Sequence, residues 1–314
     1  MRTGLAYMGH HNPKHMQTDL KDMQSLGCDD VFLAAQENDF VYMTGKLDFF
    51  PQIAKDNGLT AWAIFWGALN YFGGGKSSQF LLNNPQAHQV NKDGSHNPSG
   101  CYNNPDCLVY IKSLIDQIAA AGFAGYFIDE PSIIKCYCPA CQELYASMHR
   151  GNLFAASLEE EQFFRKKSIV RYVCLLADYI RLNYPQMQTM CCMMPQDQKA
   201  WEDISRIDTL DSLGTDIYWV NQQTAVEQMR PLIKEMAGLC KIKNKLHHQW
   251  LQAWGVKAGR ESRIIEQGEI LISEKPDALY AWAYQGQIGT SETCENPQKS
   301  WDAVCEIFRK AKEI

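Results

Sequence analysis

The sequence lacks a long apolar run: no stretch of about 18 consecutive apolar residues occurs, so a membrane-spanning helix is not expected. It also lacks an excess of positive charge, since 30 lysines and arginines stand against 36 aspartates and glutamates, with a formal net charge of −6. A protein that binds a phosphate backbone needs a basic face, so nucleic acid is not an expected partner. The first residues, MRTGLAYMGHH, contain no long apolar segment, and no signal peptide is expected there.

No stretch rich in proline, serine and glycine divides the chain, so we expect a single domain over residues 1–314. The segment after the first apolar run, MGHHNPKH, is not a glycine-rich phosphate-binding turn, which argues against a doubly wound sheet. Twelve cysteines are many, but half of them lie in apolar runs, where a reduced cysteine behaves as a small hydrophobe. A reducing, cytoplasmic setting is therefore expected. These six residues are Cys28, Cys174, Cys191, Cys192, Cys240 and Cys305.

Strand-like and helix-like segments alternate along the whole chain. The helix-like segments carry apolar residues at intervals of three and four, as in the stretch from Tyr110 to Ile118. Eight such units predict an α/β fold of the (β/α)8 TIM barrel type. The expected strands are Thr3–Met8, Asp30–Ala35, Ala61–Trp66, Gly125–Ile128, Gln188–Met194, Ser212–Trp219, Leu246–Ala253 and Ala278–Tyr284.

The residues that follow the expected strands are rich in tryptophan, tyrosine, amides and carboxylates. Active-site groups of this fold lie at the carboxyl ends of the strands, so these residues form the expected binding site. Aromatic faces stack on the apolar faces of sugar rings, while amides and acids bond to sugar hydroxyls. A carbohydrate is therefore the expected ligand. The predicted substrate-binding residues are His10, Glu37, Trp66, Tyr218, Trp219, Gln252, Trp254 and Gln285.

Two adjacent carboxylates end the fourth expected strand, in the segment GYFIDEP from Gly125 to Pro131. Neighbouring strand residues point to opposite faces, so at most one of Asp129 and Glu130 can point fully into the barrel mouth unless the strand bends. Pro131 ends the hydrogen bonding of the strand. Surface or helix-capping roles are the alternative, and the position at a strand end favours a catalytic one.

A dense group of cysteines follows, with Cys136, Cys138 and Cys141 within six residues. Tetrahedral zinc needs four ligands, and the fourth is expected from Cys101 or Cys107, in the long segment that follows the third strand. That segment, about 40 residues from 66 to 105, is expected to have little structure of its own, so a metal that tied it to the loop 132–145 would stabilise it. Four sulfurs leave no open coordination position, so the Zn²⁺ is expected to be structural. A redox pair or free thiols are the alternatives.

The run from Gly100 to Tyr145, GCYNNPDCLVYIKSLIDQIAAAGFAGYFIDEPSIIKCYCPACQELY, resembles the corresponding part of glycoside hydrolase family 42, the zinc-containing β-galactosidases. The preceding stretch, NKDGSHNPSG, is also similar to that family's loop. The resemblance implies a barrel glycosidase in which Glu130 is the general acid/base. It also implies a zinc site made of Cys101, Cys136, Cys138 and Cys141.

The chain departs from that family at three places. The family has asparagine where this chain has Asp129, and it has a nucleophilic glutamate at the end of strand seven. Here strand seven reads HHQWLQAWG, with Gln249 and Gln252 and no carboxylate. The sequence also ends after the eighth helical segment, so the family's later domains are not expected.

Two functions follow from these patterns. The first is a glycoside hydrolase that acts on a small oligosaccharide or glycoside, with Glu130 as the acid. Such enzymes usually need a second carboxyl group, for which Asp216 is the first candidate, followed by Glu37, Asp39 and Asp129. The second is a barrel that binds carbohydrate but has lost hydrolysis together with its nucleophile. The sequence does not specify an oligomeric state.

Overall fold

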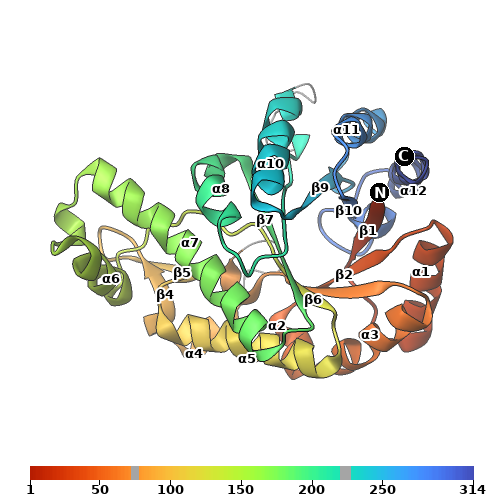
Figure 1. Cartoon of the computed structure of the whole chain (residues 1–314). Helices are drawn as coiled ribbons and strands as arrows, with labels where there is room; N and C mark the ends of the chain where they lie inside the picture. Colours follow the sequence, from red (N-terminus) through yellow and green to blue (C-terminus); the bar gives the residue numbers. More distant parts are fainter. Residues whose placement is uncertain (72–77, 220–227) are drawn as a thin grey trace.

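Eight strands close into a parallel barrel (Figure 1). The computed structural model describes residues 1–71, 78–219 and 228–314. Around the barrel the strands follow the order β1, β10, β9, β8, β7, β6, β3 and β2, and each neighbouring pair is parallel. Their bounds are β1 Arg2–Tyr7, β2 Asp30–Ala35, β3 Thr60–Phe65, β6 Gly125–Ile128, β7 Gln188–Met193, β8 Ser212–Thr215, β9 Leu246–Gln252 and β10 Ala278–Trp282.

Each predicted apolar run contains one of these strands, so the predicted (β/α)8 barrel is confirmed. The bounds differ most after β8, because residues 216–219 were expected to continue the strand and do not. The neighbouring strand β7 ends at Met193, which pairs with Thr215, so the residues after Thr215 have no ladder partner on that side. Asp216 is therefore the first residue beyond the carboxyl end of β8, which is where this fold places its active sites.

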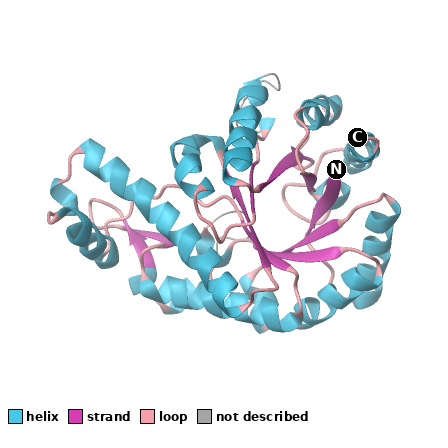
Figure 2. Ribbon diagram, in the orientation of Figure 1, coloured by secondary structure: helices cyan, strands magenta, loops and turns pink. Residues whose placement is uncertain are grey.

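The helices pack outside the strands (Figure 2). In α5, the side chain of Asn104 accepts hydrogen bonds from the N–H groups of Asp106 and Cys107, and Gly122 ends the helix with a φ of 91°. In the described part of the chain no helix is long and apolar enough to cross a membrane. The described helices are α1 Pro13–Ser25, α2 Glu37–Val41, α3 Gly45–Asp56, α4 Gln79–Asn83, α5 Pro105–Ala121, α6 Pro139–His149, α7 Leu158–Asn183, α8 Gln198–Ser205, α10 Met229–Lys243, α11 Ser262–Ser273 and α12 Pro297–Lys312.

Large side chains fill the inside of the barrel. Glycines make room for them: a Cβ atom at Gly125 would overlap the ring of Trp62, and one at Gly214 would overlap His248. Because the interior is filled in this way, a ligand reaches the barrel at its open carboxyl end and not through a pore. The buried interior cluster consists of Ala6, Phe32, Ala34, Trp62, Ile64, Phe127, Met190, Cys192, Tyr218, Trp250, Ala278, Tyr280, Trp282 and Ala283.

The long segment 66–105 has more structure than the sequence predicted, and that expectation was wrong. Apart from residues 72–77, which lie outside the described part, it contains α4 and a hairpin of β4 (His88–Val90) and β5 (His96–Gly100). The turn of this hairpin forms because Gly94 adopts a φ of 85° and the Asp93 carboxylate accepts from the N–H of Ser95 at 2.9 Å. Figure 1 shows the hairpin beside α6, at one side of the barrel.

Candidate active site and metal centre

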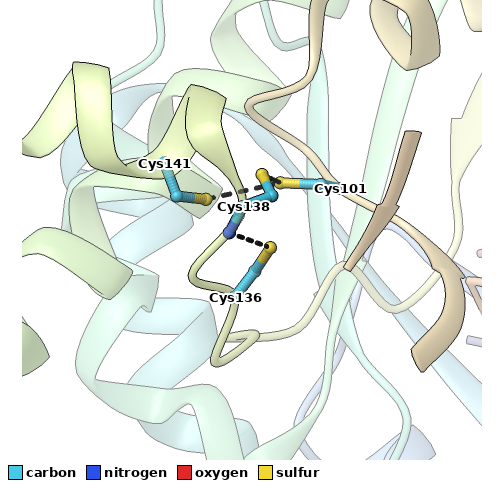
Figure 3. Close-up of side chains that lie close together, drawn as sticks. All are labelled: Cys101, Cys136, Cys138 and Cys141. Carbon is cyan, nitrogen blue, oxygen red and sulfur yellow. Dashed lines mark hydrogen bonds between the residues drawn. The ribbon is translucent and has the colours of Figure 1, made fainter. Parts of the chain in front are cut away.

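Four cysteine side chains meet between the hairpin and α6 (Figure 3). Cys101 directly follows β5, Cys136 and Cys138 lie in the segment between β6 and α6, and Cys141 lies in the first turn of α6. The four sulfur atoms lie within 4.8 Å of one another, with Cys101 Sγ at 3.4 Å from Cys141 Sγ and 3.6 Å from Cys138 Sγ. All four residues are buried. The predicted group of four is therefore assembled by the fold.

This donor set fits a metal ion. Four ligands held ~2.3 Å from one tetrahedral ion lie ~3.8 Å apart, which is close to the separations here. N–H donors surround the cluster: Val90 N lies 3.4 Å from Cys136 Sγ, and Asn103 Nδ2 lies 3.3 Å from Cys141 Sγ. Hydrogen bonds among the four thiols lower the pKa of Cys136 and of Cys138, and hydrogen bonds with these two residues raise the pKa of Cys101 and of Cys141. Thiolates are the form of cysteine that binds metal, so the buried cluster can hold an ion.

Cys107, the other candidate for the fourth ligand, lies outside this cluster. Its Sγ atom is 3.5 Å from the carbonyl oxygen of Ala87, and burial raises its pKa to about 12. A protonated thiol that packs in the core behaves as a small hydrophobe. Of the two cysteines that the sequence offered for this position, the structure brings Cys101 to the other three.

Three carboxyl groups gather at the carboxyl end of the barrel, which the sequence predicted as the catalytic region. Asp129 and Glu130 follow β6 directly, and Asp216 follows β8. Glu130 has a φ of 38°, in the left-handed region, so the alternation of an extended strand does not apply to it. Its carboxyl group forms a hydrogen bond with that of Asp216. The bend that would let Glu130 reach the mouth is thus present in the backbone.

Burial raises the pKa of all three groups, but to different extents. The pKa of Asp129 and that of Glu130 lie well above the usual value, and the neighbouring Asp216 carboxylate raises that of Glu130 further. Burial raises the pKa of Asp216 only to about 6, because its hydrogen bond with Glu130 opposes this effect. Near neutral pH the proton of this pair therefore resides on Glu130 and the negative charge on Asp216.

Access to the three carboxyl groups also differs. Asp216 is only 2% exposed, whereas Asp129 and Glu130 are each partly exposed. Apart from the bond between the Asp216 and Glu130 carboxyl groups, Asp216 Oδ1 has no hydrogen-bond partner among the described residues. Glu130 or a ligand hydroxyl would satisfy this buried acceptor.

Aromatic side chains also lie at the carboxyl ends of the strands. Tyr218 and Trp282 are buried in the interior cluster, and Trp66 and Trp254 pack on it while remaining partly exposed. The rings of Trp66 and Trp282 lie 6.1 Å apart, and those of Tyr218 and Trp254 lie 5.4 Å apart at 90°. Three of the predicted substrate-binding residues, Trp66, Tyr218 and Trp254, therefore lie in or against one cluster, the aromatic wall at this end of the barrel. Trp219 instead packs against the layer between strands and helices, apart from the interior cluster that holds Tyr218.

Gln252 occupies the end of β9, the seventh strand of the barrel in chain order. Its side chain is fully buried, and Nε2 donates to the carbonyl oxygen of Trp254 at 3.1 Å. The amide therefore supports the turn after β9. No carboxyl group stands at this strand end, as the sequence indicated.

Glu37 has a different role from the predicted one, and the prediction that it binds substrate is corrected here. Its Oε1 atom accepts from Leu69 N at 2.8 Å and from Ser78 Oγ at 2.6 Å, and its Oε2 atom accepts from Phe80 N at 3.3 Å. The residue is buried, and both oxygens are used by the long segment after β3. Glu37 therefore anchors that segment.

His10 and Gln285 lie beside a separate hollow at the ends of β1 and β10. Its volume is ≈ 280 Å³, and Tyr7, Asp19 and Tyr284 also line it. His10 Nε2 is 3.4 Å from Asp19 Oδ2, and Gln285 Nε2 donates to the hydroxyl of Tyr284 at 3.0 Å. The structure thus groups these two predicted residues together at the ends of β1 and β10.

One acidic residue near the mouth was missed by the sequence analysis. Glu292 lies in the loop after β10, and its negative charge contributes to the raised pKa of Glu130. The signal in the sequence was only an acid in the segment SETCEN. Sequence alone does not show in which direction an acid in such a loop points.

Comparison with known proteins places this architecture among glycoside hydrolase barrels. No family model and no curated protein matches the sequence. Among solved structures, a β-galactosidase from the Antarctic haloarchaeon Halorubrum lacusprofundi is similar, with a TM-score of 0.78 and 14% identity over 100% of this chain and 58% of that one. A GH42 β-galactosidase from G. stearothermophilus has a TM-score of 0.75 and 11% identity, over 99% of this chain and 56% of that one. The endo-1,4-β-mannanase of Rhizomucor miehei is similar with a TM-score of 0.67 and 12% identity, over 100% of this chain and 95% of the mannanase.

At these identities the likeness shows a shared fold. The chain spans less than two thirds of the length of the two β-galactosidases and nearly all of the mannanase. The solved neighbours are β-galactosidases, one of them a GH42 enzyme, and other glycoside hydrolases, and this chain shares their (β/α)8 TIM barrel fold.

Proposed function

We propose that this protein is a glycoside hydrolase that acts on a small oligosaccharide or glycoside, with Glu130 as its general acid. The observation that carries the proposal is the hydrogen-bonded pair of Glu130 and Asp216 at the carboxyl end of the barrel. A general acid must hold its proton near neutral pH, and the raised pKa of Glu130 meets that requirement. The glycoside hydrolase neighbours support the substrate class.

In the proposed reaction Glu130 donates its proton to the oxygen that leaves the anomeric carbon. The charge of Asp216 keeps that proton on Glu130 until the leaving oxygen needs it. Asp216 was predicted as the second carboxyl group of the reaction. Its burial and its bond to Glu130 suit it better to positioning the acid. Asp129 lies beside the acid and adds to the charge around Asp216.

The aromatic wall would bind the sugar rings. Trp66 and Trp254 each expose part of a ring next to the buried Tyr218 and Trp282. Indole faces stack on the C–H faces of sugars, and the carboxyl groups accept from hydroxyls. This combination favours a neutral carbohydrate over a phosphorylated or strongly anionic ligand, because the mouth already carries acidic groups.

We also propose that Cys101, Cys136, Cys138 and Cys141 hold one structural Zn²⁺. When bound, the ion would neutralise the thiolates and tie the β4–β5 hairpin to the start of α6. Four sulfur ligands leave no position for substrate, so the metal takes no part in the reaction. No disulfide bond joins any of the twelve cysteines, which supports a reducing, cytoplasmic setting.

A second candidate function is carbohydrate binding without hydrolysis. The observation that favours it is Gln252, which stands at the end of β9 where the resembling family has its nucleophile. An amide cannot attack the anomeric carbon as a carboxylate does. This candidate predicts that the protein binds sugars and leaves every glycosidic bond intact.

The pH dependence of kcat/KM tests the proposed function. With short galacto-, manno- and fuco-oligosaccharides, whose departing oxygen needs a proton, as a first panel, kcat/KM is expected to rise with pH through about 6, as Asp216 loses its proton. It should fall again only at a pH well above the usual range of carboxyl groups, when Glu130 loses the proton that it must donate. The rise and the fall of kcat/KM with pH both report the coupled ionisation of Glu130 and Asp216. Asp216→Asn should remove the rise of kcat/KM near pH 6. A variant that keeps this rise would contradict the assignment to Asp216.

A further inference from the structure

The proposed hydrolysis needs a second carboxyl group, and the mouth does not supply it where strand seven ends. A glycosidase of this kind uses one carboxyl as the acid and another to attack the anomeric carbon or to activate water. Glu130 fills the first role in the proposal. Asp216 is nearly fully buried and is bonded to that acid, and Gln252 is an amide. Asp129 is the direct chain neighbour of the acid, and burial holds its pKa well above the usual value, so it keeps its proton and cannot attack or act as a base. The remaining group therefore comes from another segment at the mouth.

The loop after β10 runs alongside the segment that follows β9. Gly255 N donates to the carbonyl oxygen of Glu292 at 2.8 Å, and Glu295 N donates to that of Val256 at 2.9 Å. Between them, the thiol of Cys294 donates to the carbonyl oxygen of Ala253 at 3.4 Å. Three contacts therefore attach the two loops to each other. They place Glu292 beside the end of strand seven, although it follows strand eight in the chain.

The carboxylate of Glu292 is available for chemistry. The residue is exposed, and in the described part of the chain its carboxylate has no hydrogen bond and no ion pair. Glu295, three residues later, shows the contrast: its carboxylate accepts from Lys257 Nζ at 2.7 Å and from Ala258 N at 3.1 Å. A carboxylate held in this way anchors a loop, whereas the carboxylate of Glu292 can turn to a ligand.

The charge of Glu292 also reaches the acid. Glu292 is the only residue of the β10–α12 loop whose charge is among the main causes of the raised pKa of Glu130. An exposed carboxylate influences a group at the mouth in this way only when it lies near that mouth. The two carboxyl groups therefore stand on different sides of one opening, Glu130 after β6 and Glu292 beside the end of β9.

We infer that Glu292 is the second carboxyl group of the active site, supplied by the loop after strand eight in place of an acid at strand seven. The inference rests on the proposed function. An electron pair, from the Glu292 carboxylate itself or from a water that it deprotonates, forms a new C–O bond at the anomeric carbon. The glycosidic C–O bond breaks, and the leaving oxygen takes the proton of Glu130. If an ester to Glu292 forms, water deprotonated by Glu130 then attacks the same carbon and releases the carboxylate.

Glu292→Gln tests this role, with Glu295→Gln as the matched control in the same loop. On a nitrophenyl glycoside that the wild type cleaves, Glu292→Gln is expected to lower kcat at least ~100-fold whatever the leaving group. Sodium azide, a small anion that can attack the anomeric carbon, should restore part of that activity and yield a glycosyl azide. Glu295→Gln should stay within ~3-fold of the wild type, because its carboxylate faces Lys257 and Ala258.

The outcomes separate this inference from the proposed function. Activity of Glu292→Gln within ~3-fold of the wild type would overturn the inference and leave the function standing. An equal loss in both variants would also overturn it, because the effect would then come from the loop and not from the carboxylate. A wild type that cleaves no glycoside would remove the proposed function itself, before either variant is compared.

Discussion

Replacing Glu130 with glutamine is expected to lower turnover by ~100- to ~10,000-fold on substrates with poor leaving groups. Such substrates, including unmodified oligosaccharides, depend on protonation of the departing oxygen. The amide of glutamine fills nearly the same space but has no acidic proton to give. Nitrophenyl glycosides leave readily without protonation, so their bond-breaking step should be affected much less. Steady-state kinetics on one substrate of each kind measures the difference.

Two controls make this result specific to the acid. Circular dichroism and metal content should be unchanged in Glu130→Gln, since the side chain is only partly buried and lies outside the cysteine cluster. Glu143→Gln, an exposed substitution on α6, should leave kinetics unchanged. If Glu130→Gln kept full activity on every substrate that the wild type cleaves, the acid would be another residue.

Replacing Cys101 with serine is expected to lower the bound metal to less than about half an equivalent. The three remaining thiolates come from one short segment, so the link to the hairpin would be lost with the fourth ligand. The apparent melting temperature should fall by roughly 5 °C or more, because the hairpin and the start of α6 would no longer be tied together. Mass spectrometry under native conditions and a thermal scan give the two values.

Cys107→Ser is the matched control for this prediction. Cys107 is equally buried and lies six residues from Cys101, but its sulfur contacts the carbonyl oxygen of Ala87 and not the cluster. The variant should keep close to one equivalent of metal. The assignment would be wrong if Cys107→Ser lost the metal and Cys101→Ser kept it. A purified wild type that holds no zinc under reducing conditions would count against the metal proposal as a whole.

The barrel could be predicted from the sequence because its determinants are local. Short apolar runs such as Gly125–Ile128 alternate with helices of three- and four-residue apolar periodicity, and stops such as Gly122 separate them. The order of such units fixes which residues stand at the carboxyl ends of strands. That is why Glu130 and Asp216 could be paired as candidates although 86 positions separate them, and why Trp66 and Trp254 could be assigned to one rim.

The wrong and missed assignments concern residues in the loops that follow the strands. Glu37 has the sequence context of a rim acid, but its oxygens accept from a segment 32 to 43 residues later, and no local pattern encodes those contacts. Glu292 was overlooked because its position depends on hydrogen bonds between two loops. The left-handed backbone at Glu130 likewise depends on the surrounding structure, since a glutamate has no intrinsic preference for it.

The most direct test of the account is product formation by the unmodified protein. The metal-loaded wild type would be incubated at pH 7 with a panel of short galacto-, gluco- and manno-oligosaccharides and their nitrophenyl glycosides, and released sugar would be followed by NMR. The account predicts cleavage of at least one substrate, with a single anomer of the released sugar at early times, before mutarotation produces the other. A folded protein that binds a sugar from this panel and releases none would contradict it, and would favour the carbohydrate-binding function that Gln252 suggests.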